Sequence, residues 1–502
     1  MLSVEWERGE QKMSGHGEYL PGLDQLGTQQ LPDETGVSST KMRFGTNGGA
    51  GPRPTRIALW GELAAALGRS TDRLQDKLPS TPTAETIPAG TTYLIQLLAH
   101  DIVRSVRSKP GDQLSLSNAM EKPITLQCIY GLGPEVAPYL FAPKSDGLSI
   151  KFALGQLEGE VYPAASDLNR DRHAKLLPQK SALIADRRND SNSFISQLTV
   201  LWAKFHNHVA DEIQSGFHPF FEEEERDPQL SAAQRFRMVR YVTQRSWLNV
   251  IENDIMAKIL DDDPAPYRGS LDGDQVNVEL SHAVMRAFHA LPLSNYKLQK
   301  TGLPVSLKVA TGTGLAIPHR LKYPEWAIDW SQFFDCGQTL AQNRTKFTLG
   351  GNSSLTSKLG GETVPVGALD YLREEEMGVA TVAKLEKLYG NYFLPQLTSG
   401  LRKGTVDILL QRHGVDPAVA DTVAQAPPVS LFLQIESHLK NDGHRLGPVG
   451  SALFAGPVRQ LMGFAGRALR ADAFEGADNL CADTMCEILN RIGWQPVQKE
   501  NS

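Results

Sequence analysis

The sequence predicts a mainly α-helical protein with one large domain, and three observations support this. Long Ala- and Leu-rich segments with helical periodicity recur at residues 55–67, 91–107, 194–214, 231–260 and 277–291. Few runs alternate with a period of two, and no internal repeat is visible. The 502-residue chain is 41% hydrophobic and 22% charged, which is typical of a globular protein with a sizeable core.

The remaining chain divides into an N-terminal arm, a loop-rich middle and further helices. Residues 1–54 are rich in Gly, Thr, Gln and Pro and lack periodicity, which indicates a loop-rich arm before a domain at 55–502. Residues 292–365, punctuated by Pro, Gly, Thr and Asn, predict loops with short helices. The later helices are expected near 366–389, 390–403, 405–413, 417–424, 428–438, 448–469 and 478–492.

Charge and hydropathy limit the classes of partner. A net charge of -6 gives no global basic field, which argues against nucleic acid as the main partner. The N-terminus holds no apolar core typical of a secretory signal, and no apolar run reaches transmembrane length. We therefore expect a cytoplasmic protein without a membrane span, unless export uses another route. The sequence does not indicate an oligomeric state.

The four cysteines are Cys128, Cys336, Cys481 and Cys486. They form no CxxC pair, and none lies beside a histidine at zinc-ligand spacing. Two cysteines five residues apart on a helix point to different faces, so we do not expect Cys481 and Cys486 to be bridged. We expect free, mostly buried thiols.

Two helical segments combine polar side chains with apolar ones. Gln96 and His100 are four residues apart, so a helix presents both on one face. The segment 185–212 begins as an Asp- and Arg-rich turn and continues as a helix bearing His206 and Asn207, with Asp190, Ser191 or Asn192 as its cap. Each segment alone is equally typical of buried, hydrogen-bonded polar pairs.

A third helix, within residues 277–296, places Arg286 and His289 three residues apart on one side, followed by Tyr296. An imidazole on this face is a candidate metal ligand, because histidine is a common ligand of metal ions in proteins. His282 lies seven residues earlier on the same side and is a rival ligand.

Together these motifs resemble the animal haem peroxidases over roughly residues 55–470. That family shows Gln-x-x-x-His-Asp, then an Asp-x-Arg turn, a helix with His-Asn, and Arg-x-x-His followed by a tyrosine. The resemblance implies a single large helical haem-peroxidase domain in which His289 is the proximal iron ligand and Arg286 reaches a haem propionate. It also implies that His100 is the distal histidine, Arg188 the distal arginine and Gln96 a residue near the halide site.

These residue types suit the cleavage of a peroxide. A neutral imidazole takes the proton of the inner peroxide oxygen and returns it to the departing oxygen. A guanidinium stabilises the charge that develops as the O–O bond breaks. The resemblance thus implies a peroxidase that reduces hydrogen peroxide and, through ferryl intermediates, oxidises small phenolic, halide or other organic substrates. Residues 436–438 and 444–450 resemble bacterial members of the superfamily.

The segment 366–378 falls where the family has Leu-Asn-x-x-Arg, with Asp370 at the asparagine position and Arg373 three residues later. We expect Asp370 to accept the ring N–H of His289, which makes the imidazole a more electron-donating ligand. The resemblance also implies that Arg373 contributes to haem binding. The alternative is a helix start in which Asp370 is an ordinary exposed acid.

The sequence departs from the family at two kinds of position. Members with covalently attached haem carry carboxylates where this chain has Ala99 and Ser191, so we expect haem b that is not covalently bound. Asp101 matches a calcium ligand, but residues 121–131 lack the expected acid, and a hard cation prefers several charged oxygens. Calcium is therefore doubtful, and Asp101 is expected to pair with an arginine instead.

Four alternative functions stay open. The first is a haem-binding protein of this fold with weak catalysis, used for sensing or partner binding. The second is a specialised biosynthetic oxidase, and the third a fatty-acid dioxygenase, although dioxygenases place a radical-forming tyrosine where this chain has Arg286. The fourth is a non-haem protein with His206 and His208 as metal ligands, but residues two apart on a helix diverge by about 200°.

Overall fold

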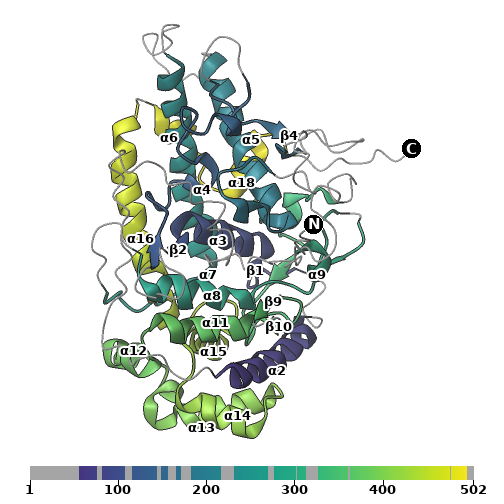
Figure 1. Cartoon of the computed structure of the whole chain (residues 1–502), viewed down its shortest axis with the longest axis vertical. Helices are drawn as coiled ribbons and strands as arrows, with labels where there is room; N and C mark the ends of the chain where they lie inside the picture. The colour runs from purple at the N-terminus through teal and green to yellow at the C-terminus, as the bar shows by residue number, and fades with distance from the viewer. Residues whose placement is uncertain are drawn as a thin grey trace, which may run out of the picture.

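The computed structural model describes residues 56–75, 82–107, 116–143, 149–155, 166–170, 182–215, 231–269, 276–300, 302–311, 326–359, 362–474 and 476–494. These residues form a mainly helical structure with short strands, as the sequence predicts (Figure 1). The arm predicted at 1–54 lies outside the described residues. No helix within the described part of the chain has the length and apolar character that crossing a membrane requires.

The long helices of the first two thirds form where periodicity predicts them. The helices of this part are α2 (Ile57–Gln75), α3 (Ala89–Ile102), α4 (Gln127–Tyr130), α5 (Ser193–Ser215), α6 (Ala232–Val250), α7 (Ala257–Ile259), α8 (Met285–Ala287) and α9 (Leu307–Ala310). The short helices α4 and α9 lie outside the predicted ranges. The later helices are α11 (Val366–Met377), α12 (Val382–Tyr389), α13 (Ser399–Arg412), α14 (Pro417–Gln425), α15 (Val429–Asn441), α16 (Pro448–Leu469), α17 (Ala477–Leu480) and α18 (Met485–Arg491).

Two glycines explain two of the differences between the C-terminal helices and their predicted boundaries, while a third is that residues 390–392 and 395–397 form 3-10 turns before α13 begins. Gly378 adopts a φ of 66° and ends α11, so the single helix predicted at 366–389 is split into α11 and α12. Gly404, by contrast, lies inside α13, which spans the boundary predicted between 403 and 405. A glycine inside a helix is about 1 kcal/mol less favourable than alanine, and the packing of α13 on α14 offsets this cost here.

The described strands pair two by two in antiparallel ribbons. They are β1 (Ile87–Pro88) with β8 (Arg344–Thr345), β2 (Ser105–Arg107) with β3 (Leu116–Asn118), β4 (Leu154–Gly155) with β5 (Asp167–Leu168), β6 (Asn295–Tyr296) with β7 (Val305–Ser306), and β9 (Thr356–Leu359) with β10 (Glu362–Pro365). The register of the first pair places Ile87 opposite Thr345. This pair joins the start of α3 to the segment that follows the helix bearing His289.

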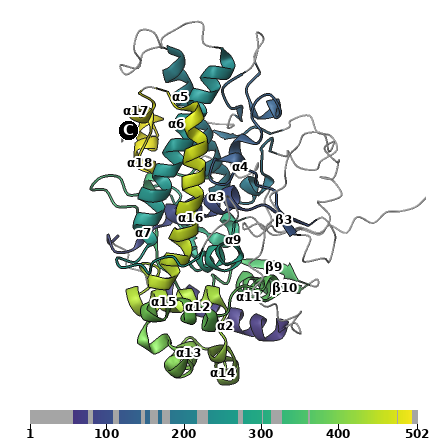
Figure 2. The same ribbon diagram turned by 90° about the vertical axis from the view of Figure 1, so that its left-hand side faces the viewer.

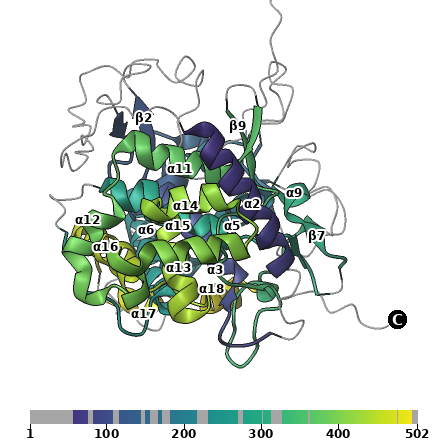
Figure 3. The same ribbon diagram turned by 90° about the horizontal axis from the view of Figure 1, so that it is seen from below.

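Helix α3 lies in the middle of the molecule, between two groups of helices (Figure 1). On one side α5 packs against both α3 and α6, and the long α16 runs along α6 (Figure 2). On the other side α8 contacts α15, and α11 contacts α2. The pair α13 and α14 covers the end of the molecule seen in Figure 3, where α14 contacts α2.

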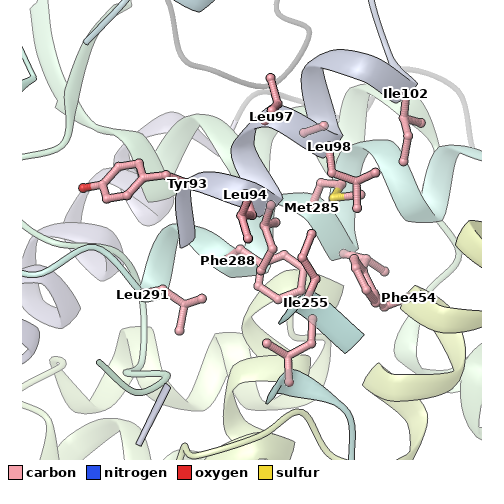
Figure 4. Close-up of a cluster of buried hydrophobic side chains, with 14 of the residues drawn as sticks. Tyr93, Leu94, Leu97, Leu98, Ile102, Ile255, Met285, Phe288, Leu291 and Phe454 are labelled. Carbon is pink, nitrogen blue, oxygen red and sulfur yellow. The ribbon is translucent and has the colours of Figure 1, made fainter. Parts of the chain in front are cut away.

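Buried hydrophobic side chains connect α3 with the elements below it (Figure 4). They belong to one continuous core in which Leu94, Leu98 and Phe288 are at most 3% exposed. Full burial of such a side chain contributes about 1.5–3 kcal/mol. This packing fixes the position of α3 relative to the helix that carries His289. Figure 4 labels Tyr93, Leu94, Leu97, Leu98, Ile102, Ile255, Met285, Phe288, Leu291 and Phe454.

Two π-helical turns interrupt the helices near this core. One, η5 (Ile251–Met256), continues α6, and the other, η6 (Leu280–Val284), precedes α8. A π turn inserts an extra residue and rotates the residues that follow it, and such turns are frequent at functional sites. The predicted helix at 277–291 therefore consists of η6, α8 and the 3-10 turn η7 (Phe288–Ala290), and periodicity did not reveal this division.

Two buried glutamates cap the N-termini of neighbouring helices. Glu374 of α11 accepts hydrogen bonds from the backbone N–H groups of Val429 and Ser430, at the start of α15. Glu436 of α15 accepts from those of Val449 and Gly450, at the start of α16. Burial raises the pKa of each carboxyl to about 7, against the lowering effect of these hydrogen bonds. The motifs at 436–438 and 444–450 thus meet in one helix junction.

A carboxyl whose pKa is higher in the folded state than in the unfolded state stabilises the fold below its unfolded pKa, and this stability is lost as pH rises through the folded pKa. Replacing Glu436 by glutamine removes the titration and one capping acceptor. Wild type should lose stability between pH 5 and pH 8 as this carboxyl ionises, whereas the glutamine variant should not. The loss of unfolding free energy caused by the substitution should therefore be larger at pH 5 than at pH 8 by about 2–3 kcal/mol, because one pKa unit corresponds to about 1.4 kcal/mol. Urea unfolding at both pH values measures this. An equal loss at the two pH values would contradict it.

The expectation of four free thiols is wrong for two of the cysteines. Cys336 and Cys486 form a disulfide with a Cα–Cα distance of 5.3 Å, whereas Cys128 and Cys481 are free. The bond joins α18 to the loop before β8, across a sequence separation of 150 residues. Spacing along the sequence could not reveal the pair, because only the folded chain brings the two residues together.

Closing a loop of this length removes freedom from the unfolded chain, which the chain-entropy relation values at about 5 kcal/mol. Replacing Cys336 by serine should therefore lower the free energy of unfolding by up to that amount. Denaturant unfolding without reductant measures the loss. The matched control is Cys481→Ser, which should change stability little, and equal effects of the two substitutions would contradict the bond.

Candidate functional site

The proximal half of the site joins three buried side chains from two helical segments. His289 lies in η7, Arg286 in α8 and Asp370 in α11. His289 Nδ1 lies 2.6 Å from Asp370 Oδ2, and Arg286 Nη1 donates to Asp370 Oδ1 at 2.7 Å. Arg286 and Asp370 are 1% and 2% exposed. The alternative in which Asp370 is an ordinary exposed acid is therefore wrong.

This arrangement determines which nitrogen of His289 can bind a metal. A carboxylate only accepts hydrogen bonds, so Nδ1 of His289 carries the proton and Nε2 has the lone pair. The positive charge of Arg286 compensates the buried charge of Asp370. The imidazole can therefore act as a ligand through Nε2 while it donates a charge-assisted hydrogen bond through Nδ1.

The segment 345–352 and α15 hold the end of the proximal helix. Thr348 Oγ1 donates to the carbonyl oxygen of Ala290 at 3.0 Å, and Gln434 Nε2 donates to that of Ala287 at 3.0 Å. A Cβ on Gly351 would lie 3.2 Å from the carbonyl oxygen of His289, so this position favours glycine. Sequence reasoning missed these positions, and the Gly-Gly pair before Asn352 is the one signal that could have indicated a close approach.

His282, the rival ligand, has different partners. It lies in η6 and is 4% exposed, with Nδ1 2.7 Å from the hydroxyl of Ser281. Asp370 contacts His289. The geometry therefore favours His289 as the ligand.

The distal half of the site starts from His100, near the end of α3. His100 is fully buried, and its Nδ1 lies 2.7 Å from Oδ1 of Asn189 in η4 (Arg187–Asp190). Gln96, one turn earlier on α3, accepts a long hydrogen bond of 3.4 Å from Nδ2 of Asn192. The predicted face of α3 thus packs against the predicted Asp- and Arg-rich turn.

Asn192 also acts as the cap of α5, one of the three residues predicted for this role. Its Oδ1 accepts from the backbone N–H groups of Phe194 and Ile195. The neighbouring hydroxyl of Ser191 is buried and has no hydrogen-bond partner within the described residues. A buried hydroxyl usually has a partner.

Arg188 clamps the end of α3. Its guanidinium forms an ion pair of 2.6 Å with Asp186 and donates to the carbonyl oxygens of His100 and Val103. Burial raises the pKa of Asp186, but Arg188 outweighs this effect and holds that pKa well below its usual range. The predicted role of Arg188, stabilising charge on a peroxide, would require its guanidinium to leave some of these partners. That role stays a prediction.

A second buried ion pair anchors the same turn. Arg170 donates to both carboxylate oxygens of Asp190, at 2.8 and 2.9 Å, and to Asp167. Sequence reasoning did not single out Arg170 or Asp167, and no motif marks them. The turn at 186–192 is thus fixed on both sides.

Asp101 contacts backbone amides, and the expectation that it pairs with an arginine is wrong. Its Oδ2 accepts from the N–H of Leu126 at 2.7 Å and from Nε1 of Trp247 at 3.1 Å. Leu126 has a φ of 54°, a strained conformation for this residue type. Burial raises the pKa of Asp101 to about 6. Asp101 therefore anchors the segment predicted to be an eroded calcium loop.

Two other predicted residues have local partners. Arg373 forms an ion pair with Glu376 on α11, with 29% of its side chain exposed.

His206 accepts from the hydroxyl of Tyr130 at 2.8 Å and donates to the carbonyl oxygen of Ile150 at 2.6 Å. Burial lowers the pKa of His206 to about 4. Both ring nitrogens of His206 are thus occupied, which argues against the metal site with His208, and no cluster of three or more His, Cys, Asp or Glu that could hold a metal ion occurs among the described residues.

No protein-family model and no curated protein sequence matches this chain. Among solved structures, Peroxidase A from Dictyostelium discoideum is similar over 92% of this chain and 93% of its own, with a TM-score of 0.59 and 14% identity. Fatty acid alpha-dioxygenases from Oryza sativa and Arabidopsis thaliana are 12% identical over 82% of this chain and 76% and 71% of theirs, with TM-scores of 0.46 and 0.47. The likeness to Peroxidase A confirms the predicted mainly helical fold class.

Proposed function

We propose that this protein is a haem peroxidase, which reduces hydrogen peroxide and oxidises a small phenolic, halide or other organic substrate. The observation that carries the proposal is the buried triad of His289, Asp370 and Arg286, within a fold shared with a peroxidase. Haem b, when bound, supplies the redox-active iron at which the peroxide is cleaved. In this proposal residues 55–502 form a single catalytic domain, and residues 1–54 form an N-terminal arm.

The residues present fit a haem. His289 would hold the haem iron through Nε2, and its hydrogen bond to Asp370 increases the electron density on the ring. The hydroxyl of Ser191, buried and without a partner within the described residues, is consistent with a further group beside the distal turn. Ala99 and Ser191 offer no carboxylate for an ester, so the haem is held without a covalent bond. We assign no calcium to Asp101, because its oxygens accept from N–H donors.

On the distal side His100 moves the proton. Its Nε2 takes the proton of the inner peroxide oxygen and returns it to the departing oxygen. Gln96 lies one turn away and contributes a polar amide beside this path. Arg188 keeps the backbone of His100 in place through its hydrogen bond to that carbonyl oxygen.

Two alternative enzymes differ in how well they fit the site. A dioxygenase of this superfamily would need a tyrosine at the position of Arg286, whose guanidinium is paired with Asp370. A specialised oxidase fits every site residue, and the reducing substrate stays open.

The predicted cytoplasmic location stays a prediction, and the Cys336–Cys486 disulfide argues against it, since such bonds persist in oxidising compartments.

Replacing Asp370 by asparagine should raise the reduction potential of the bound haem. The amide oxygen still accepts from His289, but the negative charge that makes the ring electron-rich is lost. Spectroelectrochemical titration of the haem-loaded protein measures the potential. Glu375→Gln is a matched control on α11, because Glu375 pairs with Arg56 on the far side. An unchanged potential in the Asp370 variant would contradict the assigned role.

Stopped-flow mixing of the haem-loaded protein with hydrogen peroxide tests the proposed function. The expected result is a rapid spectral change, followed by return to the starting spectrum as a phenolic dye is oxidised. A fast spectral change with poor dye turnover would favour a specialised oxidase. A haem-loaded protein whose spectrum does not respond to peroxide would overturn the proposal in favour of a sensing or binding role.

A further inference from the structure

We propose that Asn189 is a positioning residue that keeps the proton on Nδ1 of His100 and so makes Nε2 the basic nitrogen. The proposal rests on the function proposed above, because it explains how His100 is prepared to receive a proton. Asn189 and His100 are both fully buried, on η4 and α3. Neither a charge pattern nor a spacing marks Asn189 in the sequence.

The orientation of the Asn189 amide follows from its second partner. Nδ2 of Asn189 donates to the carbonyl oxygen of Cys128 at 3.1 Å. A carbonyl oxygen only accepts, so the NH2 group must face Cys128 and Oδ1 must face His100. Oδ1 has no proton to donate. Nδ1 of His100, 2.7 Å away, is therefore the donor in this contact.

This contact selects one tautomer of His100. A neutral imidazole carries one ring proton, so a proton on Nδ1 leaves the lone pair on Nε2. The other tautomer would place two buried acceptors against each other, which is disfavoured by about tenfold to a hundredfold. In the proposed reaction Nε2 gains one proton from the peroxide and returns it to the departing oxygen. Asn189 neither gains nor loses a proton throughout.

The neighbours of Asn189 prevent the amide from turning away. Its backbone N–H donates to the carbonyl oxygen of Asp186 at 3.0 Å. The preceding residue, Arg188, is paired with Asp186, and the following residue, Asp190, is paired with Arg170. The two ion pairs and the 3-10 turn thus hold Asn189 between α3 and α4. The turn is a rigid support for the distal histidine.

Nitrogen NMR of the haem-free protein tests the tautomer without any activity. The protein is labelled with 15N in its histidine rings, and the spectrum of His100→Gln identifies the signals of His100. At a pH where the ring is neutral, wild type should show a protonated Nδ1 and an unprotonated Nε2, and Asn189→Leu should reduce this preference. A wild-type ring protonated at Nε2 would overturn the proposal, even if the protein proves to be a peroxidase.

The pH dependence of the reaction provides a second test. Asn189→Leu, which lacks an acceptor, should slow the reaction with peroxide by about tenfold to a hundredfold, the factor by which the acceptor favours the Nδ1–H tautomer. Asn189→Asp keeps the acceptor and adds negative charge, so the acid limb of the pH–rate profile should move to higher pH. If Asn189→Leu does not fold, the tautomer of His100 in wild type and the pH–rate profile of Asn189→Asp still test the proposal.

Asn207→Ala is the matched control, because the amide of Asn207 also makes two hydrogen bonds, both to the backbone of Phe152. Asn207 lies on α5, beyond the distal turn. It should lose stability without a change in tautomer or pH profile. A wild-type rate and tautomer in Asn189→Leu would overturn the proposal. A protein that binds no haem but keeps the Nδ1–H tautomer would overturn the proposed function and leave the geometry of Asn189 established.

Discussion

Replacing His289 by glycine is expected to abolish stoichiometric haem binding, because the substitution removes the nitrogen that binds the iron. Asp370 and Arg286 would still neutralise each other, so the fold should survive. Titration of the haem-free variant with haem should give no Soret band above that of free haem. Imidazole added in solution can occupy the space of the lost side chain and should restore the band.

His282→Ala is the control for this experiment. His282 contacts Ser281, and its loss should leave the Soret band intact. A His289 variant that binds one haem per chain without added imidazole would contradict the assignment. If His282→Ala loses the band instead, His282 is the ligand.

Replacing His100 by leucine should preserve haem binding and slow the reaction with peroxide by about a hundredfold to ten-thousandfold, the usual contribution of general acid–base catalysis. The variant loses the nitrogen that accepts the proton, while α3 keeps its packing. Stopped-flow rate constants measured against peroxide concentration provide the comparison. Substrate binding and haem content should change little.

His413→Gln is a matched control, because His413 is a buried histidine that contacts the hydroxyl of Ser70, where α13 meets α2. It should react with peroxide at the wild-type rate. Equal rates in the His100 variant and wild type would remove His100 from the mechanism. A loss of the Soret band in the His100 variant would mean that His100, and not the proximal histidine alone, holds the haem.

Helical periodicity was sufficient to predict that Arg286 and His289 share one side of a helix, whereas their roles came from the family pattern. Three residues of separation on a helix place Arg286 and His289 on one side, and both contact Asp370. The pairing with Asp370 came from the family pattern, since nothing local in the sequence joins positions 289 and 370. The mainly helical fold followed from the long periodic segments.

The distal half could be predicted only in part. Gln96 and His100 share a face of α3, as spacing requires, but the partner of His100 is Asn189, on a turn that sequence patterns identify only as polar. The contacts of Arg188 depend on the path of the backbone at the end of α3. Such contacts are tertiary, and local propensity carries no information about them.

The same reason explains the other differences. The disulfide, the backbone partners of Asp101 and the helix caps made by Glu374 and Glu436 all join residues far apart in the sequence. The π turns arise from packing that period counting does not detect. Sequence patterns therefore predicted which residues share a helix face, and the fold determined their partners.

The visible absorption spectrum of the purified protein, before and after addition of haem, tests the central claim most directly. The expected result is a Soret band at one haem per chain, which shifts when peroxide is added and is lost in the His289 variant. A protein that shows no Soret band beyond that of free haem, at any ratio of haem to chain, would contradict the claim that His289 and Asp370 form a haem site.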